Sequence, residues 1–264
     1  MSLANAAAVL HWLKRDHLDV AVGELAAAMR WPKSTTSRLL SEMQKLGLLE
    51  RDPVTRRYRL GLLMLELATR YRAGEPVVEA ADAALAEITR RTGHSTGISL
   101  LDGIEVVVLR SRAGTQPLRV VTPPGDRGPA WASSTGRALL ARLPDAEIAR
   151  RFVRFPTTAR PAAPASLGAL MQRIGRVRIQ GWEEAADEQI PGLGGVAVVI
   201  HDPHAGEAMA LYVAFSALHV NRQERRELAQ MLLEAAAQLR GRFGIDAEFG
   251  TEPVASRLQR RAHG

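Results

Sequence analysis

Residues 32–40 read PKSTTSRLL, in which four consecutive hydroxyl side chains stand between a lysine and an arginine. Hydroxyl, ammonium and guanidinium groups are the donors that proteins use to bind phosphate oxygens and the edges of bases. Behind them Leu39, Met43 and Leu46 recur at helical spacing, and Gly47 supplies a helix end. The segment therefore predicts a helix with one buried face and one polar face that is free for a partner.

The polar face of this helix is typical of a helix that reads double-stranded DNA. The candidates for base-edge contacts are Thr35, Thr36 and Arg38. The candidates for shared base and phosphate contacts are Lys33, Ser34 and Ser37.

Two further predicted helices position this face. Residues 22–29 form a short helix that a tight turn joins to the polar helix, which is the arrangement of a helix-turn-helix. Residues 3–14 repeat apolar side chains at helical spacing and give the helix that closes a three-helix core.

A two-stranded hairpin follows and is expected to act as a wing. Residues 48–60 alternate around a turn at Asp52 and Pro53. We expect Arg56 and Arg57 of this wing to enter the minor groove or to grip the DNA backbone.

Composition and charge agree with a globular DNA-binding protein. The 264 residues allow two domains, and the absence of cysteine excludes disulfides, thiolate nucleophiles and zinc fingers. No apolar run reaches membrane-spanning length, so we expect a cytoplasmic protein without a membrane partner. The net charge is +7, and residues 1–73 carry +5 of it, from three Lys and nine Arg against seven acids. Positive charge therefore gathers where DNA phosphates would be neutralised.

The chain is expected to divide into residues 1–60 as a winged helix-turn-helix domain, 61–75 as a linker helix, 76–246 as a second domain and 247–264 as a flexible tail. Residues 60–73 are too rich in leucine to lie alone in water, so we expect them to pack on the same helix of a second subunit. Two strand pairs, one of them around Asp102 and Gly103, alternate with helices beyond the linker. They predict an α+β fold with an antiparallel sheet.

Three stretches resemble IclR-type bacterial transcriptional regulators. ELAAAMRWPKSTTSRLLSEMQKLGLLERDPVTRRYRLG resembles the winged helix of that family, and ASSTGRALLARLP resembles a later segment in which Arg137 stands here in place of lysine. GWEEAADEQIPGLGGVAVVIHD resembles the family segment that carries an acidic pair and the following strand. The resemblance implies a GAF-like effector-binding second domain, a homodimer that often pairs into a tetramer, and palindromic operators. It also implies a small organic effector, frequently a carboxylate or an aromatic acid.

Candidate effector contacts begin at Ser133, Ser134 and Thr135, which open a predicted helix whose free N–H groups and positive dipole end suit a carboxylate. The alternative is that these hydroxyls only cap the helix. Pockets of the family are built around this turn and around residues 183–195. The resemblance therefore adds a further set of effector-binding candidates, which are Asp187, Glu188 and Gly195, with Leu118 and Trp131 as apolar walls.

Two departures from the family pattern bear on the effector. Ala185 and Ala186 stand where members often carry another acid, and Gly195 stands where some members have a side chain that contacts ligand. We therefore expect a wider and less polar pocket, which favours a bulkier or aromatic effector.

Two other functions are open to these residues. An enzyme would use Ser133 or Ser134 as nucleophile with a histidine as base, but no nucleophile-elbow pattern surrounds the serines. The candidate bases are His94, His201, His204 and His219. A winged helix that binds protein is the other alternative, and its affinity would not fall steeply with salt as DNA binding does. We expect a regulator without catalytic residues, metal or cofactor.

Overall fold

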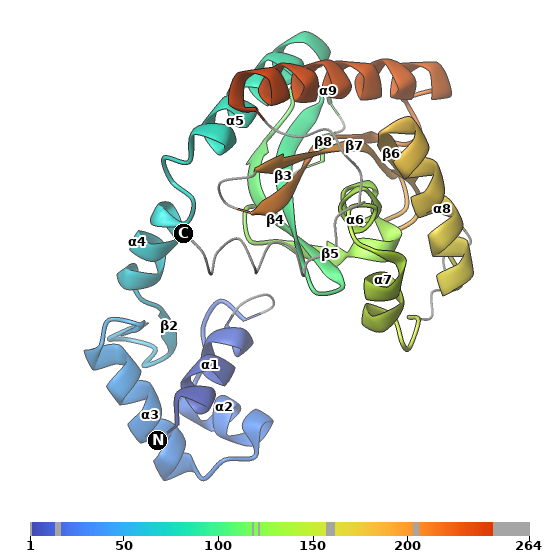
Figure 1. Cartoon of the computed structure of the whole chain (residues 1–264). Coiled ribbons are helices and arrows are strands. Elements are labelled where there is room, and N and C mark those ends of the chain that lie inside the picture. The colour runs from blue at the N-terminus through green and yellow to red at the C-terminus, as the bar shows by residue number, and fades with distance from the viewer. Residues whose placement is uncertain are drawn as a thin grey trace, which may run out of the picture. The chain divides into compact units, whose positions relative to one another are not determined.

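The computed structural model describes residues 2–13, 17–117, 119–120, 122–156, 162–202 and 206–244, and its contacts divide the chain into one unit that ends at Gly74 and another that begins at Glu75 (Figure 1). In the first unit, α1 (Leu3–Trp12), α2 (Val22–Met29) and α3 (Lys33–Lys45) enclose a small core around Val9, Leu25 and Leu40. The predicted helix-turn-helix is confirmed.

A short hairpin completes the first unit. Strand β1 (Leu49–Arg51) pairs antiparallel with β2 (Tyr58–Leu60), and Val20 adds a bridge to Tyr58. The Tyr58 ring is buried in the core of the unit, so the base of the wing is anchored there.

Helix α4 (Leu62–Arg70) is shorter than the predicted linker helix and contains no buried residue. Its side chains Leu62, Leu65 and Leu67 are 66%, 61% and 54% exposed. Within one chain, these leucines therefore remain in contact with water.

The second unit is built on a six-stranded antiparallel sheet in the order β5-β4-β3-β8-β7-β6. The strands are β3 (Ser95–Asp102), β4 (Glu105–Arg112), β5 (Arg127–Pro129), β6 (Trp182–Ala186), β7 (Leu193–Asp202) and β8 (Glu207–Ser216). The expected α+β class and the antiparallel sheet are confirmed. The two edge strands β5 and β6 were not among the predicted strand pairs.

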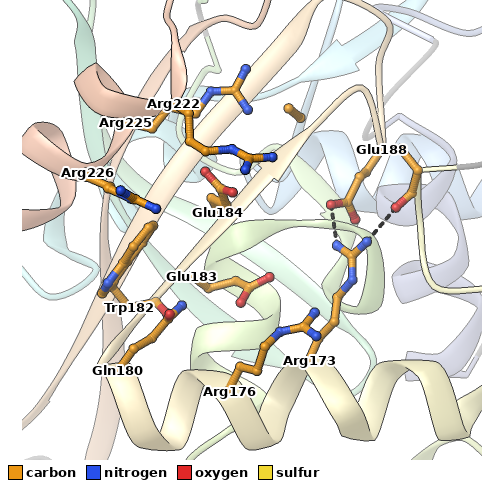
Figure 2. Close-up of a pocket in the computed structure, with 12 residues that line it drawn as sticks. Arg173, Arg176, Gln180, Trp182, Glu183, Glu184, Glu188, Arg222, Arg225 and Arg226 are labelled. Atoms are coloured by element: carbon orange, nitrogen blue, oxygen red, sulfur yellow. Dashed lines mark hydrogen bonds and ion pairs between the residues drawn. The ribbon is translucent and has the colours of Figure 1, made fainter.

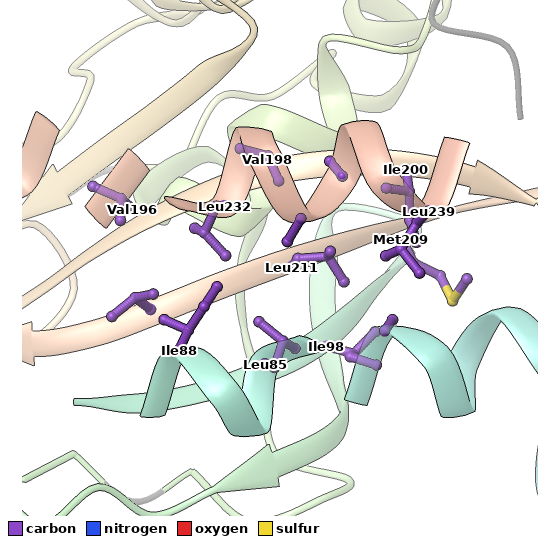
Figure 3. Packing of buried hydrophobic residues seen from close by; sticks show 14 of the residues in the cluster. Leu85, Ile88, Ile98, Val196, Val198, Ile200, Met209, Leu211, Leu232 and Leu239 are labelled. Carbon is purple, nitrogen blue, oxygen red and sulfur yellow. The ribbon is translucent and has the colours of Figure 1, made fainter. Parts of the chain in front are cut away.

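Helices cover both faces of this sheet, because the strands alternate apolar residues with a period of two. Val196 and Val198 of β7 face α5 (Pro76–Thr92) and α9 (Arg222–Phe243), where Leu85 and Leu232 pack against them (Figure 3). Ala197 and Val199 face the opposite core. The elements of that core are the 3-10 turn η1 (Ala130–Ala132), α6 (Ser134–Leu140), α7 (Asp145–Arg151) and α8 (Leu167–Gln180).

A helix that spans a bilayer needs a run of about 20 predominantly apolar residues. Among the described residues, no helix is both long and apolar enough to cross a membrane.

Candidate functional site

The N-terminal turn of α3 presents the predicted polar face. Pro32 is the N-cap rather than the first helical residue, and Lys33 begins the helix. Thr35 is half-buried beside this face. The residues that are exposed are Lys33, Ser34, Ser37 and Arg38. One cationic, hydroxyl-bearing surface therefore lies opposite the apolar side of the helix.

The prediction that Thr36 contacts a base is wrong. Its side chain is fully buried, and its hydroxyl donates to the Pro32 carbonyl oxygen over 3.1 Å. Helical periodicity is the reason, because positions 36, 39, 40 and 43 lie on one stripe, and Leu39, Leu40 and Met43 of that stripe form the core.

Arg57 of the wing binds the protein's own carboxylates. Its Nε donates to Asp19 over 2.7 Å, and its two terminal nitrogens donate to Glu24 over 2.9 and 2.7 Å. These bonds raise the pKa of Arg57, with Glu24 as the larger cause, and they lower the pKa of Glu24. Arg57 therefore ties the wing to Asp19 before α2 and to Glu24 in the first turn of α2, which differs from its predicted role in DNA contact.

Arg56 is exposed at the tip of the wing in a left-handed conformation with φ of 60°. Asp52 shapes this tip, because its carboxylate accepts from the Val54 and Thr55 amides over 2.9 and 2.7 Å. The Arg56 amide donates to the Asp52 carbonyl oxygen over 3.0 Å. The local backbone therefore presents the Arg56 side chain to solvent from a hydrogen-bonded turn.

Arg137 is the centre of the second unit, and its side chain is fully buried. Nε donates to Glu183 over 2.7 Å, and Nη1 donates to the Trp131 carbonyl oxygen over 3.1 Å and to Glu188 over 2.6 Å. Nη2 donates to the Glu184 carbonyl oxygen over 2.8 Å and to Glu188 over 3.0 Å. All five N–H groups of the guanidinium therefore have acceptors.

The acids around Arg137 are also buried. Burial raises the pKa of Glu183, and the neighbouring Arg137 opposes that shift. Glu188 binds Arg137 and accepts from Arg173 over 2.5 Å, so its carboxylate lies between two guanidinium groups. Glu188 is therefore engaged in ion pairs, in contrast to its predicted role as a free effector contact.

The serine-threonine turn of α6 supplies the cap of that helix. Ser133 caps the helix, because its hydroxyl accepts from the Gly136 amide over 3.1 Å and donates to the Pro129 carbonyl oxygen over 3.1 Å. Ser134 and Thr135 are 6% and 8% exposed. The capping alternative therefore holds for Ser133.

The space beside Gly195 is occupied by Ser134. A β-carbon added at Gly195 would lie 3.2 Å from the Ser134 hydroxyl oxygen and 3.3 Å from the Val213 carbonyl oxygen. At Gly195 a hydroxyl and a neighbouring strand therefore already border the space that a side chain would enter.

Two other predicted effector residues have structural roles, and a third is not placed. Asp187 adopts a φ of 60° and accepts from the Gly192 amide over 2.7 Å, which closes the turn before β7. Trp131 is buried, packs edge-on against Phe155, and gives its carbonyl oxygen to Arg137. Leu118 lies outside the described residues.

A cavity of about 510 Å³ lies between α8, β6 and the start of α9, and its arginines were not predicted as site residues (Figure 2). Glu188 is the one predicted effector residue in its lining. The repeated arginines of RIGRVR and RQERRE are the sequence signal for this cleft. Within the described ranges, no group of three side chains is arranged to hold a metal ion.

Comparison with known families and relatives gives matches over nearly the whole chain. Residues 2–53 match the IclR helix-turn-helix domain, and residues 69–240 match the C-terminal domain of bacterial transcriptional regulator IclR. The chain is 27% identical over 247 residues to the HTH-type transcriptional regulator XynR of Escherichia coli, covering 93% of this chain and 98% of XynR. It is 26% identical over 228 residues to KdgR of the same organism, covering 86% of each.

Solved structures match at a similar level. A putative IclR transcriptional regulator from Silicibacter sp. aligns with a TM-score of 0.79 at 26% identity, covering 94% of this chain and 99% of that chain. An IclR homolog from Microbacterium hydrocarbonoxydans complexed with 4-hydroxybenzoate aligns with a TM-score of 0.77 at 22% identity, covering 90% and 99%. The second likeness is one of fold.

Replacing Arg137 by methionine tests the buried cluster. We expect Arg137→Met to lower the free energy of unfolding by about 3 to 5 kcal/mol, because Glu183 and Glu188 would lose the cation that compensates their burial. Urea denaturation followed by circular dichroism measures the change. Adding Glu183→Gln and Glu188→Gln should restore part of the loss, and an unaltered midpoint in the single variant would contradict this role.

Proposed function

Because this chain belongs to the IclR family of bacterial transcriptional regulators, we propose that the exposed N-terminal turn of α3 reads its DNA operator and that a small organic effector controls it. The observation that carries the proposal is the separation of the two faces of α3. Lys33 and Arg38 are exposed, whereas Leu40 and Met43 are buried. The chain is a DNA-binding regulator and not an enzyme, and we place its activity in the cytoplasm, where the chromosome lies.

We assign sequence reading to Thr35 and Arg38, and we exclude Thr36 because it is buried. An arginine can donate two hydrogen bonds to the major-groove edge of guanine, which makes Arg38 the stronger candidate. Lys33, Ser34 and Ser37 surround it and are assigned to phosphates and neighbouring bases. At the wing, Arg56 is assigned to the DNA backbone or minor groove, and Arg57 holds the wing in place.

We propose a homodimer in which α4 of one copy packs on α4 of another. Support comes from the exposure of its leucines, since a nine-residue helix without buried residues gains little stability alone in water. Two copies would set the distance between two recognition helices, and a palindromic operator would match that distance. From the resemblance to the family, we also expect two such dimers to pair into a tetramer.

We propose that the effector is a small organic acid bound in the second unit. The Microbacterium hydrocarbonoxydans homolog, which was solved in complex with 4-hydroxybenzoate, supports that class. Since Asp187 and Glu188 already bind other groups of the protein, the remaining polar candidates are Ser134 and Thr135 at the start of α6, with Trp131 in the apolar wall. The effector changes operator affinity only if it binds two arrangements of the protein unequally.

Arg38→Ala tests base reading. We expect operator affinity to fall by about 1 to 3 kcal/mol and sequence preference to relax, whereas Arg56→Ala should weaken operator and random DNA alike. Fluorescence anisotropy with both duplexes across a salt series measures both effects. Equal losses on the two duplexes for Arg38→Ala would remove it from the base-reading set, and salt-independent binding would favour the protein-interaction alternative.

The pair Leu62→Glu and Leu65→Glu tests the α4 contact. We expect this double variant to sediment as a monomer and to bind operator at least about 100-fold more weakly, because two linked half-site contacts become one. Leu218→Glu is the control, since Leu218 is 80% exposed and lies far along the chain from α4. Retention of the wild-type sedimentation coefficient by the double variant would contradict the contact.

Thr135→Val tests the effector region without a change of side-chain volume. The wild type is first screened by thermal shift against aromatic and aliphatic monocarboxylic acids, 4-hydroxybenzoate included. We expect at least one of these acids to raise its melting temperature, because a ligand that binds the folded state stabilises it. For any acid that does so, Thr135→Val should reduce affinity by about 10-fold, because a buried polar contact would be lost. Undiminished affinity in the variant would move the effector away from α6.

A further inference from the structure

The arginine-lined cleft of the second unit has no role in the functions above. Five arginines and three glutamates line it, for a net charge of +2. Figure 2 shows Arg222 and Arg226 entering from the side of α9 and Arg176 from α8, with Glu183 and Glu184 between them. Charge of one sign from two helices therefore converges on one cavity, which focuses the electrostatic field there.

The inner arginines of the cleft, Arg173 and Arg225, make hydrogen bonds within the protein. Arg173 donates to Glu188 and to the Ala162 carbonyl oxygen over 2.5 and 2.7 Å. Arg225 donates to the Val220 and Ala217 carbonyl oxygens and lies over the Phe215 ring. Both of these arginines therefore already have hydrogen-bond acceptors within the protein.

The outer charges differ from the inner ones. Arg176, Arg222 and Arg226 are exposed, and none of them makes a hydrogen bond or ion pair through its side chain in the described part of the chain. The carboxylate of Glu184 is likewise unpaired there, although its carbonyl oxygen accepts from Arg137. Three guanidinium groups and one carboxylate acceptor therefore remain available to a bound molecule.

We propose that this cleft binds a compact organic polyanion, of the class of a di- or tricarboxylate or a phosphate ester, through Arg176, Arg222 and Arg226. Guanidinium groups bind carboxylates and phosphates through paired hydrogen bonds. The volume of about 510 Å³ falls within the range of roughly 300 to 1,000 Å³ that small-molecule sites occupy. Glu184 accepts from a hydroxyl of the ligand, and the Trp182 side chain supplies an apolar wall.

Calorimetric titration with citrate and with pyrophosphate tests this site, at a fixed ionic strength of about 0.15 M. We expect at least one of the two to bind, and acetate to bind far more weakly. Arg226→Gln should weaken that binding by about 10-fold through loss of a charge-assisted contact. Glu184→Gln should strengthen it by about threefold, because one repelling charge is removed.

Two matched variants distinguish binding in the cleft from a general effect of charge and from binding at α6. Arg91 is exposed on α5 and does not line the cleft, so Arg91→Gln makes the same charge change elsewhere and should leave the affinity unchanged. Thr135→Val should also leave it unchanged, because Thr135 does not line the cleft. Binding of citrate alone identifies a carboxylate site, and binding of pyrophosphate alone identifies a phosphate site.

Three results would overturn the proposal. The first is the absence of binding by both polyanions. The second is equal weakening by Arg91→Gln and Arg226→Gln, which would assign the effect to the overall field of the protein. The third is a change of sedimentation coefficient in Arg226→Gln without ligand, which would assign the cleft to contact between copies of the chain. All of these measurements are independent of DNA binding.

Discussion

The buried guanidinium of Arg137 is the constraint that organises the second unit. A charged group removed from water must find an acceptor for each donor, and here the acceptors come from η1, β6 and the segment that reaches Glu188. Together those elements supply acceptors to all three nitrogens of Arg137. Because desolvation offsets much of the attraction in such a cluster, its main effect is to specify geometry rather than to add net stability.

Arginine serves two different purposes in each unit, and the local supply of acceptors decides which. In the wing, Arg57 is held by Asp19 and Glu24, whereas the side chain of Arg56 extends from an ordered turn. In the second unit, Arg137 and Arg173 share Glu188, whereas Arg176 lies at the edge of the cleft. In both units, exposed arginines thus lie near arginines that are already paired with carboxylates of the protein.

Sequence patterns predicted the fold class, the helix-turn-helix and the hairpins, because helix period, turn residues and strand alternation are local signals. Thr36 shows where composition misled, since its hydroxyl suggested a polar surface while its position relative to Leu40 and Met43 placed it in the core. The ion pairs of Arg137 could not be predicted from local patterns, because its partners Glu183 and Glu188 lie 46 and 51 residues away along the chain. Strand β6 was missed because it is five residues long and carries charged residues.

Lysine occurs at only three positions, 14, 33 and 45, all before residue 75, and Lys33 is exposed at the first turn of α3. Acylation neutralises a lysine side-chain amine and leaves guanidinium groups unchanged. Acetylation of side-chain amines would therefore modify only the DNA-binding unit and would remove a charge from the start of α3. The arginines of the second unit would keep their charge under the same chemistry.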